Sequence, residues 1–93
     1  MPSKFEDIAA EVGKVVTTKN TAYGDSFSRT HVVLYQLYPH GIQFDQYQDV
    51  LFIARVLDKL FRIATNPDYA NEDPFQDIAG YAILAIEQRR GKK

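Results

Sequence analysis

The sequence predicts an all-α domain, a small bundle of about four helices, two long and two shorter, that is completed by oligomerisation. Apolar residues recur at three- and four-residue spacing over long stretches, as on the buried face of a helix. Capping residues and Pro or Gly positions divide these stretches. Only residues 31–37 are compatible with either a helix or a strand. The 93 residues form a single domain, because a typical domain of ~100–200 residues leaves no room for a second.

The first helix is expected between Ser3 and about Thr18, because Ser3 and Glu6 have the spacing of a capping box. Its apolar stripe consists of Phe5, Ile8, Ala9, Val12, Val15 and Val16. Residues 19–28 have the composition of a loop.

A shorter second helix is expected over about 29–37. The residues that can cap its start are Asp25, Ser26 and Ser28. Pro39 and Gly41 end it, because proline lacks the amide hydrogen that a continuing helix needs.

The longest helix is expected to begin at Asp45, which has capping-box spacing with Gln48, and to end before Asn66-Pro67. It spans roughly 30 Å at 1.5 Å per residue. Residues 66–72 form a polar connector.

The last helix is expected to begin with Asp73 as its N-cap and Pro74 at its first position, where proline is best tolerated. It should run to about Arg90, followed by Gly91 at the first position beyond its end.

Charge and cysteine content exclude several classes of protein. The 11 Lys and Arg residues nearly balance the 12 Asp and Glu residues, so no strong signal for nucleic-acid binding is present. The chain has no cysteine, which excludes disulfides, cysteine-based zinc sites and thiol chemistry. No apolar run reaches the ~18–20 residues that span a bilayer, and no signal-peptide pattern begins the chain. We therefore expect a cytoplasmic protein without membrane partners.

Four charged residues of the long helix share one side, at positions i, i+3, i+4 and i+7. They are Arg55, Asp58, Lys59 and Arg62. The residues expected to face the core from this helix are Tyr47, Val50, Leu51, Ala54, Leu57, Phe61 and Ala64. The charged stripe has two interpretations: a solvated face on which Asp58 pairs with its neighbours, or one wall of a cleft for a polyanion.

Three carboxylates, those of Glu72, Asp73 and Asp77, lie within about one turn where the last helix begins. Asp73 can be only an N-cap, and Asp77 only a first-turn acid favoured by the helix dipole. Alternatively, the three form a metal site that Asp58 completes. Oxygen ligands of this kind suit Mg²⁺ or Mn²⁺.

Lys19, Asn20 and Tyr23 follow the first helix and offer contacts to a nucleotide. Lys19 can reach a phosphate, and Asn20 and Tyr23 can contact a base. The alternative is an ordinary turn, with Asn20 as a helix C-cap and Tyr23 at the edge of the core.

Together these segments resemble the phage and bacterial "nucleotide modification associated" domain family, which is similar to the all-α nucleoside triphosphate pyrophosphatases of the MazG type. The resemblance covers about residues 19–86. Its motifs are Lys19-Asn20-x-x-Tyr23-Gly24-Asp25-Ser26-Phe27, Arg55-x-x-Asp58-Lys59-x-x-Arg62-Ile63 and Asp73-x-x-x-Asp77-Ile78-Ala79-Gly80-Tyr81-Ala82.

The chain departs from the MazG pattern of Glu-x-x-Glu on one helix and Glu-x-x-Asp on the next. Arg55-x-x-Asp58 stands in the first place, and Pro74 stands where the Glu of the second motif would fall. Asp77 matches the terminal Asp, and Asp73 lies four residues before it instead of three.

The resemblance implies a nucleotide-binding protein of the bacterial or phage-infected host cytoplasm, with Mg²⁺-dependent hydrolysis of a (deoxy)nucleoside triphosphate to monophosphate and pyrophosphate. Catalysis is assigned to Asp58 and Asp77, and metal binding to Asp58, Glu72, Asp73 and Asp77. Phosphate binding is assigned to Lys19, Arg55, Lys59 and Arg62, and base or sugar binding to Asn20, Tyr23 and Tyr81. The alternatives are a non-catalytic nucleotide sensor, a sequestering protein or DNA-modification accessory, and a structural helical oligomer whose charged stripe makes salt bridges between subunits.

Apolar residues outside the expected core predict a homodimer or a dimer of dimers through the last two helices. They are Phe52, Val56, Leu60 and Ile63 on the long helix, and Ile83 and Leu84 on the last. Exposing each such side chain forgoes about 1.5–3 kcal/mol, and a two-fold partner would cover them with the same patch.

Overall fold

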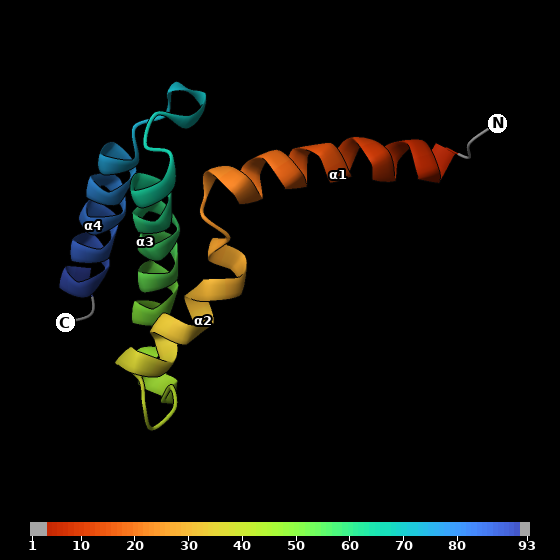
Figure 1. The fold of residues 1–93 in the computed structure, drawn as a ribbon. Coiled ribbons are helices and arrows are strands. Elements are labelled where there is room, and N and C mark those ends of the chain that lie inside the picture. Colours follow the sequence, from red (N-terminus) through yellow and green to blue (C-terminus); the bar gives the residue numbers. More distant parts are fainter. Residues whose placement is uncertain (1–3, 92–93) are drawn as a thin grey trace.

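The computed structural model describes residues 4–91, and these form helices and turns without any strand (Figure 1). The four α-helices are α1 (Lys4–Ala22), α2 (Ser26–Leu37), α3 (Tyr47–Thr65) and α4 (Pro74–Gly91). Two 3-10 turns, η1 (Phe44–Gln46) and η2 (Tyr69–Asn71), precede α3 and α4. The predicted all-α class is confirmed, and residues 31–37 are helical. None of the helices in this part of the chain is long and apolar enough to cross a membrane.

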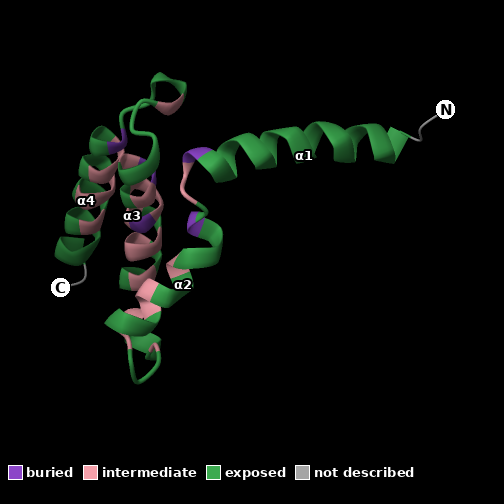
Figure 2. Ribbon diagram, in the orientation of Figure 1, coloured by how far each residue is buried: buried purple, intermediate pink, exposed green. Residues whose placement is uncertain are grey.

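Helix α3 is the centre of the arrangement, because α2 packs on one side of it and α4 on another (Figure 1). Helix α1 instead projects away from the other three and packs along none of them. The result is an extended molecule of 59 × 30 × 25 Å. Figure 2 shows that α1 is exposed along nearly its whole length, whereas the half-buried residues concentrate where α3 meets its neighbours.

The expected division of α3 into one core face and one uncovered face is wrong. Phe52, Val56 and Ile63, expected outside the core, are half-buried, whereas Tyr47 and Leu51, expected inside it, are exposed. The reason is that α3 lies between two helices. One helix neighbour would cover a single stripe, but two neighbours cover separate stripes and leave the positions between them in solvent.

Residues 19–28 are not the continuous loop that their composition predicts. Helix α1 continues to Ala22, and the hydroxyls of Thr17, Thr18 and Thr21 donate to carbonyls four residues earlier. The helix ends in a Schellman motif, in which the amide of Asp25 donates to the carbonyl of Asn20 at 3.0 Å. Gly24 provides the positive φ, of 62°, that this motif needs. Ser3, the expected N-cap of α1, lies outside the described residues.

Helix α2 begins at Ser26, three residues earlier than expected. Asp25 occupies the N-cap position, but its left-handed backbone conformation directs the chain into the helix without a capping bond from its side chain. The helix ends at Leu37, two residues before Pro39, as predicted.

The capping box before α3 involves different residues from those expected. Gln43 and Gln46 form it, and the amide of Gln43 donates to Oε1 of Gln46 at 2.8 Å. The expected pair, Asp45 and Gln48, does not cap, because Asp45 lies inside the 3-10 turn η1. The end of α3 at Thr65, before Asn66-Pro67, agrees with the prediction.

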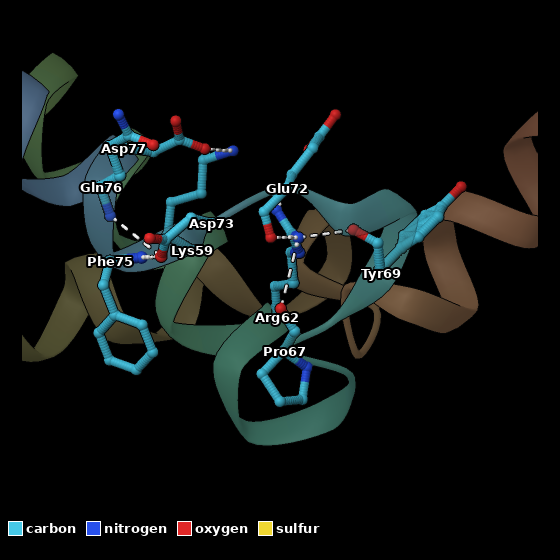
Figure 3. Close-up of polar contacts among 9 residues, drawn as sticks. All are labelled: Lys59, Arg62, Pro67, Tyr69, Glu72, Asp73, Phe75, Gln76 and Asp77. Atoms are coloured by element: carbon cyan, nitrogen blue, oxygen red, sulfur yellow. Dashed lines mark hydrogen bonds and ion pairs between the residues drawn. The ribbon is translucent and has the colours of Figure 1, made fainter.

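Asp73 caps α4 as the sequence predicts, and Pro74 is the first helical residue. The amides of Phe75 and Gln76 donate to Oδ1 of Asp73 at 3.0 and 3.3 Å (Figure 3). At its other end the helix includes Gly91, one residue beyond the expected end.

Removing this cap has a predictable effect on stability. We expect Asp73→Ala to lower the free energy of unfolding by about 1 kcal/mol, because two amides lose their acceptor. Asp73→Asn keeps an oxygen acceptor without the charge and should retain most of the stability. Urea denaturation followed by circular dichroism measures both variants. Equal losses in the two variants would show that the charge, and not the capping oxygen, is what stabilises α4.

Candidate functional site

The centre of the candidate site is an ion pair between α3 and α4. Nζ of Lys59 lies 3.1 Å from Oδ2 of Asp77 (Figure 3). The lysine side chain is 13% exposed and the aspartate side chain 40%. The carboxylate of Asp77 is thus the more accessible partner of the pair, and the stem of Lys59 is the part that packing holds in place.

The surroundings of Lys59 keep its ammonium group charged. Burial alone lowers the pKa of this lysine, but the hydrogen bond to Asp77 and the electrostatic interactions with Tyr23, Asp77 and Tyr81 outweigh that effect. The net result is a pKa above the ordinary value for lysine. At neutral pH this position therefore presents a fixed positive charge.

Two tyrosine rings lie near the ion pair, one from the turn between α1 and α2 and one from α4 itself. Nζ of Lys59 lies 5.9 Å from the ring centre of Tyr23, which belongs to the turn between α1 and α2. The guanidinium of Arg55 lies 5.7 Å from the ring centre of Tyr81 on α4. We call these five residues, Tyr23, Arg55, Lys59, Asp77 and Tyr81, the Lys59 cluster.

A groove between α3 and α4 begins at Arg55 and runs away from Lys59. Its volume is about 410 Å³. The residues that line it are Gln48, Leu51, Phe52 and Arg55 from α3, and Tyr81, Leu84, Ala85 and Gln88 from α4. Apolar walls with a cation and a tyrosine at one end are a typical composition for a small-molecule site.

Arg62 lies one turn beyond the Lys59 cluster and is fully buried. Its guanidinium donates to the carbonyls of Tyr69 and Glu72, both at 2.7 Å, to the carbonyl of Pro67 at 3.5 Å, and to Oε2 of Glu72 at 3.2 Å (Figure 3). It therefore holds the connector between α3 and α4 against α3. Its predicted role in phosphate binding would require this connector to open first.

The four predicted metal ligands are not brought together. Glu72 pairs with Arg62, Asp73 caps α4, and Asp77 pairs with Lys59. Asp58 is half-buried on α3 and makes no ion pair within residues 4–91. That part of the chain contains no group of three or more His, Asp or Glu residues placed to hold a metal ion. These carboxylates thus do not fit a preformed Mg²⁺ or Mn²⁺ centre within one chain, and the cofactor stays a prediction.

Lys19 and Asn20 lie in the last turns of α1 instead of a loop. Their carbonyls accept hydrogen bonds from the amides of Tyr23 and Asp25, so both residues help to end the helix. Their side chains are exposed, and no hydrogen bond or ion pair in the described region links them to the Lys59 cluster. A role for Lys19 and Asn20 in ligand binding stays a prediction.

Two residues outside the sequence-based hypothesis help to position the cluster. Tyr69 of η2 packs edge-on against Tyr23, with ring centres 6.1 Å apart. Arg29 of α2 lies 4.6 Å from the ring centre of Phe61 on α3 and donates to the carbonyl of Gly24 at 3.1 Å. The two ring contacts, Tyr69 with Tyr23 and Arg29 with Phe61, join segments far apart in sequence, so local patterns gave no signal for them.

Comparisons of the chain with protein-family models, with curated proteins and with solved structures found no match.

Proposed function

We propose that the chain binds a nucleotide at the Lys59 cluster and the groove beside it. The observation that carries the proposal is that four residues expected from the sequence to contact a nucleotide lie close together. They are Tyr23, Arg55, Lys59 and Tyr81. They come from three separate segments and lie in two cation–ring contacts around one ion pair.

In this proposal the phosphate groups bind Lys59 and Arg55. The ammonium of Lys59 is held in the charged form and its stem is mostly buried, so little side-chain freedom is lost when a phosphate binds. Arg55 is exposed and has a planar guanidinium, which can donate two parallel hydrogen bonds to a phosphate. Asp77, which is more exposed than Lys59, releases the lysine when the anion arrives.

The base and sugar occupy the groove between α3 and α4. Tyr81 stands at the junction of the groove with the cluster, and its ring offers a face on which a base can stack. The groove volume of about 410 Å³ lies within the roughly 300–1,000 Å³ typical of small-molecule sites.

Binding without turnover is the function that this arrangement favours. Three of the four carboxylates expected to hold Mg²⁺ already have structural partners, namely a buried arginine, two helix amides and Lys59. Hydrolysis of a nucleoside triphosphate would need those contacts to be exchanged for metal ligation. Hydrolysis of the nucleotide is therefore the alternative hypothesis that the experiments below compare with binding alone.

The test measures the affinity for deoxynucleoside triphosphates by calorimetry, with and without Mg²⁺. We expect Lys59→Met to weaken binding at least tenfold, because the central cation is lost while the apolar stem is kept. Lys14→Met is the matched control and should leave the affinity unchanged. Lys14 is an exposed residue of α1, the helix that projects away from α3 and α4 (Figure 1). Unchanged affinity in Lys59→Met together with a lowered melting temperature would contradict the proposal and leave Lys59 with a structural role.

Asp77→Asn separates nucleotide binding from hydrolysis. If binding is electrostatic, the variant should bind the nucleotide at least as tightly as the wild type without Mg²⁺, because Lys59 no longer has a carboxylate partner. If Asp77 holds a catalytic metal, the variant should lose Mg²⁺-dependent binding and pyrophosphate release. Far-UV circular dichroism checks that the Asp77→Asn variant is as helical as the wild type.

A further inference from the structure

Helix α1 exposes an apolar stripe that no other segment of residues 4–91 covers. Figure 2 shows α1 exposed along nearly its whole length. The stripe has five large side chains that are between 48% and 79% exposed, namely Phe5, Ile8, Val12, Val15 and Val16. Their spacing is that of a helix that packs against a partner. A stripe that continues over three turns is larger than the isolated apolar residues common on protein surfaces.

The molecule has more surface than a compact monomer of its size. Its accessible surface is 7505 Å², against about 5,500 Å² expected from the scaling of area with a mass of 10.6 kDa. Its radius of gyration is 16.8 Å, against about 12 Å expected for a compact chain of 93 residues. The difference of about 2,000 Å² is ample for an interface of standard size, which buries about 800 Å² on each partner.

The turn between α1 and α2 prevents α1 from folding back onto α3 and α4. Ala22 and Ser26, on either side of the turn, are both buried. Gly24 adopts positive φ and lies directly against the side chain of Thr65 at the end of α3. The turn is thus fixed by packing, and it directs α1 away from α3 and α4 (Figure 1). Within residues 4–91, therefore, no segment buries the stripe.

We propose that the stripe of α1 binds α1 of a second copy of this chain in an antiparallel pair. Lys19 lies seven residues after Val12 and fourteen after Phe5, so it continues the line of the stripe at its C-terminal end. In a parallel pair in register, the two Lys19 ammonium groups would face each other. A two-fold axis near the middle of the stripe, between Ala10 and Glu11, instead places them at opposite ends of the interface and sets Phe5 of each copy beside Val16 of the other. The stripe is therefore better matched to itself in the antiparallel orientation.

The charges of α1 favour a protein partner over a lipid surface. The helix carries three lysines and three acidic residues, so it has no net positive charge to attract anionic headgroups. The interface predicted along the last two helices is a separate hypothesis. It lost part of its support when Phe52, Val56 and Ile63 proved half-buried within one chain.

Light scattering after size exclusion tests the proposal on the full chain. We expect a species of about 21 kDa, twice the mass of 10.6 kDa, at micromolar concentrations. The double variant Val12→Asp/Val15→Asp should run as a monomer. The matched control Ala10→Asp/Thr17→Asp adds the same charge to the opposite side of α1 and should remain a dimer. A monomeric wild type, or a dimer that persists in the Val12→Asp/Val15→Asp variant, would overturn the proposal.

Disulfide cross-linking tests the orientation with one small substitution in each copy. The chain has no cysteine, so each introduced thiol has a unique position. A mixture of the single variants Phe5→Cys and Val16→Cys should give a mixed disulfide dimer on mild oxidation, whereas each variant alone should give little, because only residues with Cα atoms within about 7 Å can be bridged. Efficient cross-linking of each variant with itself, and none in the mixture beyond that, would overturn the antiparallel arrangement.

Discussion

Arg62→Met is expected to lower the free energy of unfolding by about 3 kcal/mol or more. The substitution removes the donor that three backbone carbonyls of the connector share, those of Pro67, Tyr69 and Glu72. An acceptor left buried without a partner costs about 1–3 kcal/mol. The methionine side chain replaces much of the buried apolar stem, so the loss measures mainly the hydrogen bonds.

Two control variants separate the buried hydrogen bonds from charge. Arg55→Met makes the same substitution about two turns earlier on α3, at an exposed position, and should change stability by no more than about 0.5 kcal/mol. Glu72→Gln removes only the charge of a carboxylate that is 56% exposed, and should cost less than about 1 kcal/mol. Urea denaturation at one fixed protein concentration measures all three variants. If Arg62→Met and Arg55→Met have equal effects, Arg62 does not hold the connector.

Gly24→Ala is expected to lower the free energy of unfolding by about 2–5 kcal/mol. The φ of 62° at this position costs a residue with a side chain about 1–2 kcal/mol. A Cβ atom would also overlap Oγ1 of Thr65, and relief of such an overlap by shifting the packed turn costs about 1–3 kcal/mol. Thermal and urea denaturation followed by circular dichroism measure the loss.

The two contributions at Gly24 can be measured separately. In the double variant Gly24→Ala/Thr65→Ala the overlap with Oγ1 of Thr65 is removed. The difference in unfolding free energy between this double variant and Thr65→Ala should therefore contain only the cost of the backbone conformation, about 1–2 kcal/mol. Gly13→Ala is the control for the change of residue type. Gly13 lies within α1 with open space around it, and its replacement should raise helix stability by about 0.5–1 kcal/mol. A Gly24→Ala variant as stable as the wild type would contradict the close approach of the turn to α3.

Helix ends were predictable where one local signal determines them. Pro39, Asn66-Pro67 and Asp73-Pro74 mark the ends of α2 and α3 and the start of α4, because proline restricts its own backbone and that of the preceding residue. The boundary between α1 and α2 was missed, because the polar composition of residues 19–25 resembles a loop. Threonine side chains bonded to the preceding turn and a Schellman motif at Gly24 carry the helix to Ala22 instead.

The candidate site was predictable as a set of residues but not as a set of contacts. Periodicity placed Arg55, Lys59 and Arg62 on one side of α3, and that placement is local geometry. Which partner each charge meets depends on the packing of α4 and of the connector. Lys59 therefore meets an acid and two tyrosines, whereas Arg62 is enclosed by carbonyls.

The sequence by itself determined the all-α class, the order of the helices and the apolar stripe of α1, because these follow from spacing and capping within single segments. Only the tertiary structure decided that α3 is covered on two sides, that Arg62 is buried and that, among residues 4–91, no three acidic residues are placed to hold one metal ion. It also decided that the stripe of α1 is left in solvent. The physical reason is that these features depend on one turn, at Gly24, and on where α4 lies against α3, and both are contacts between segments that no local pattern contains.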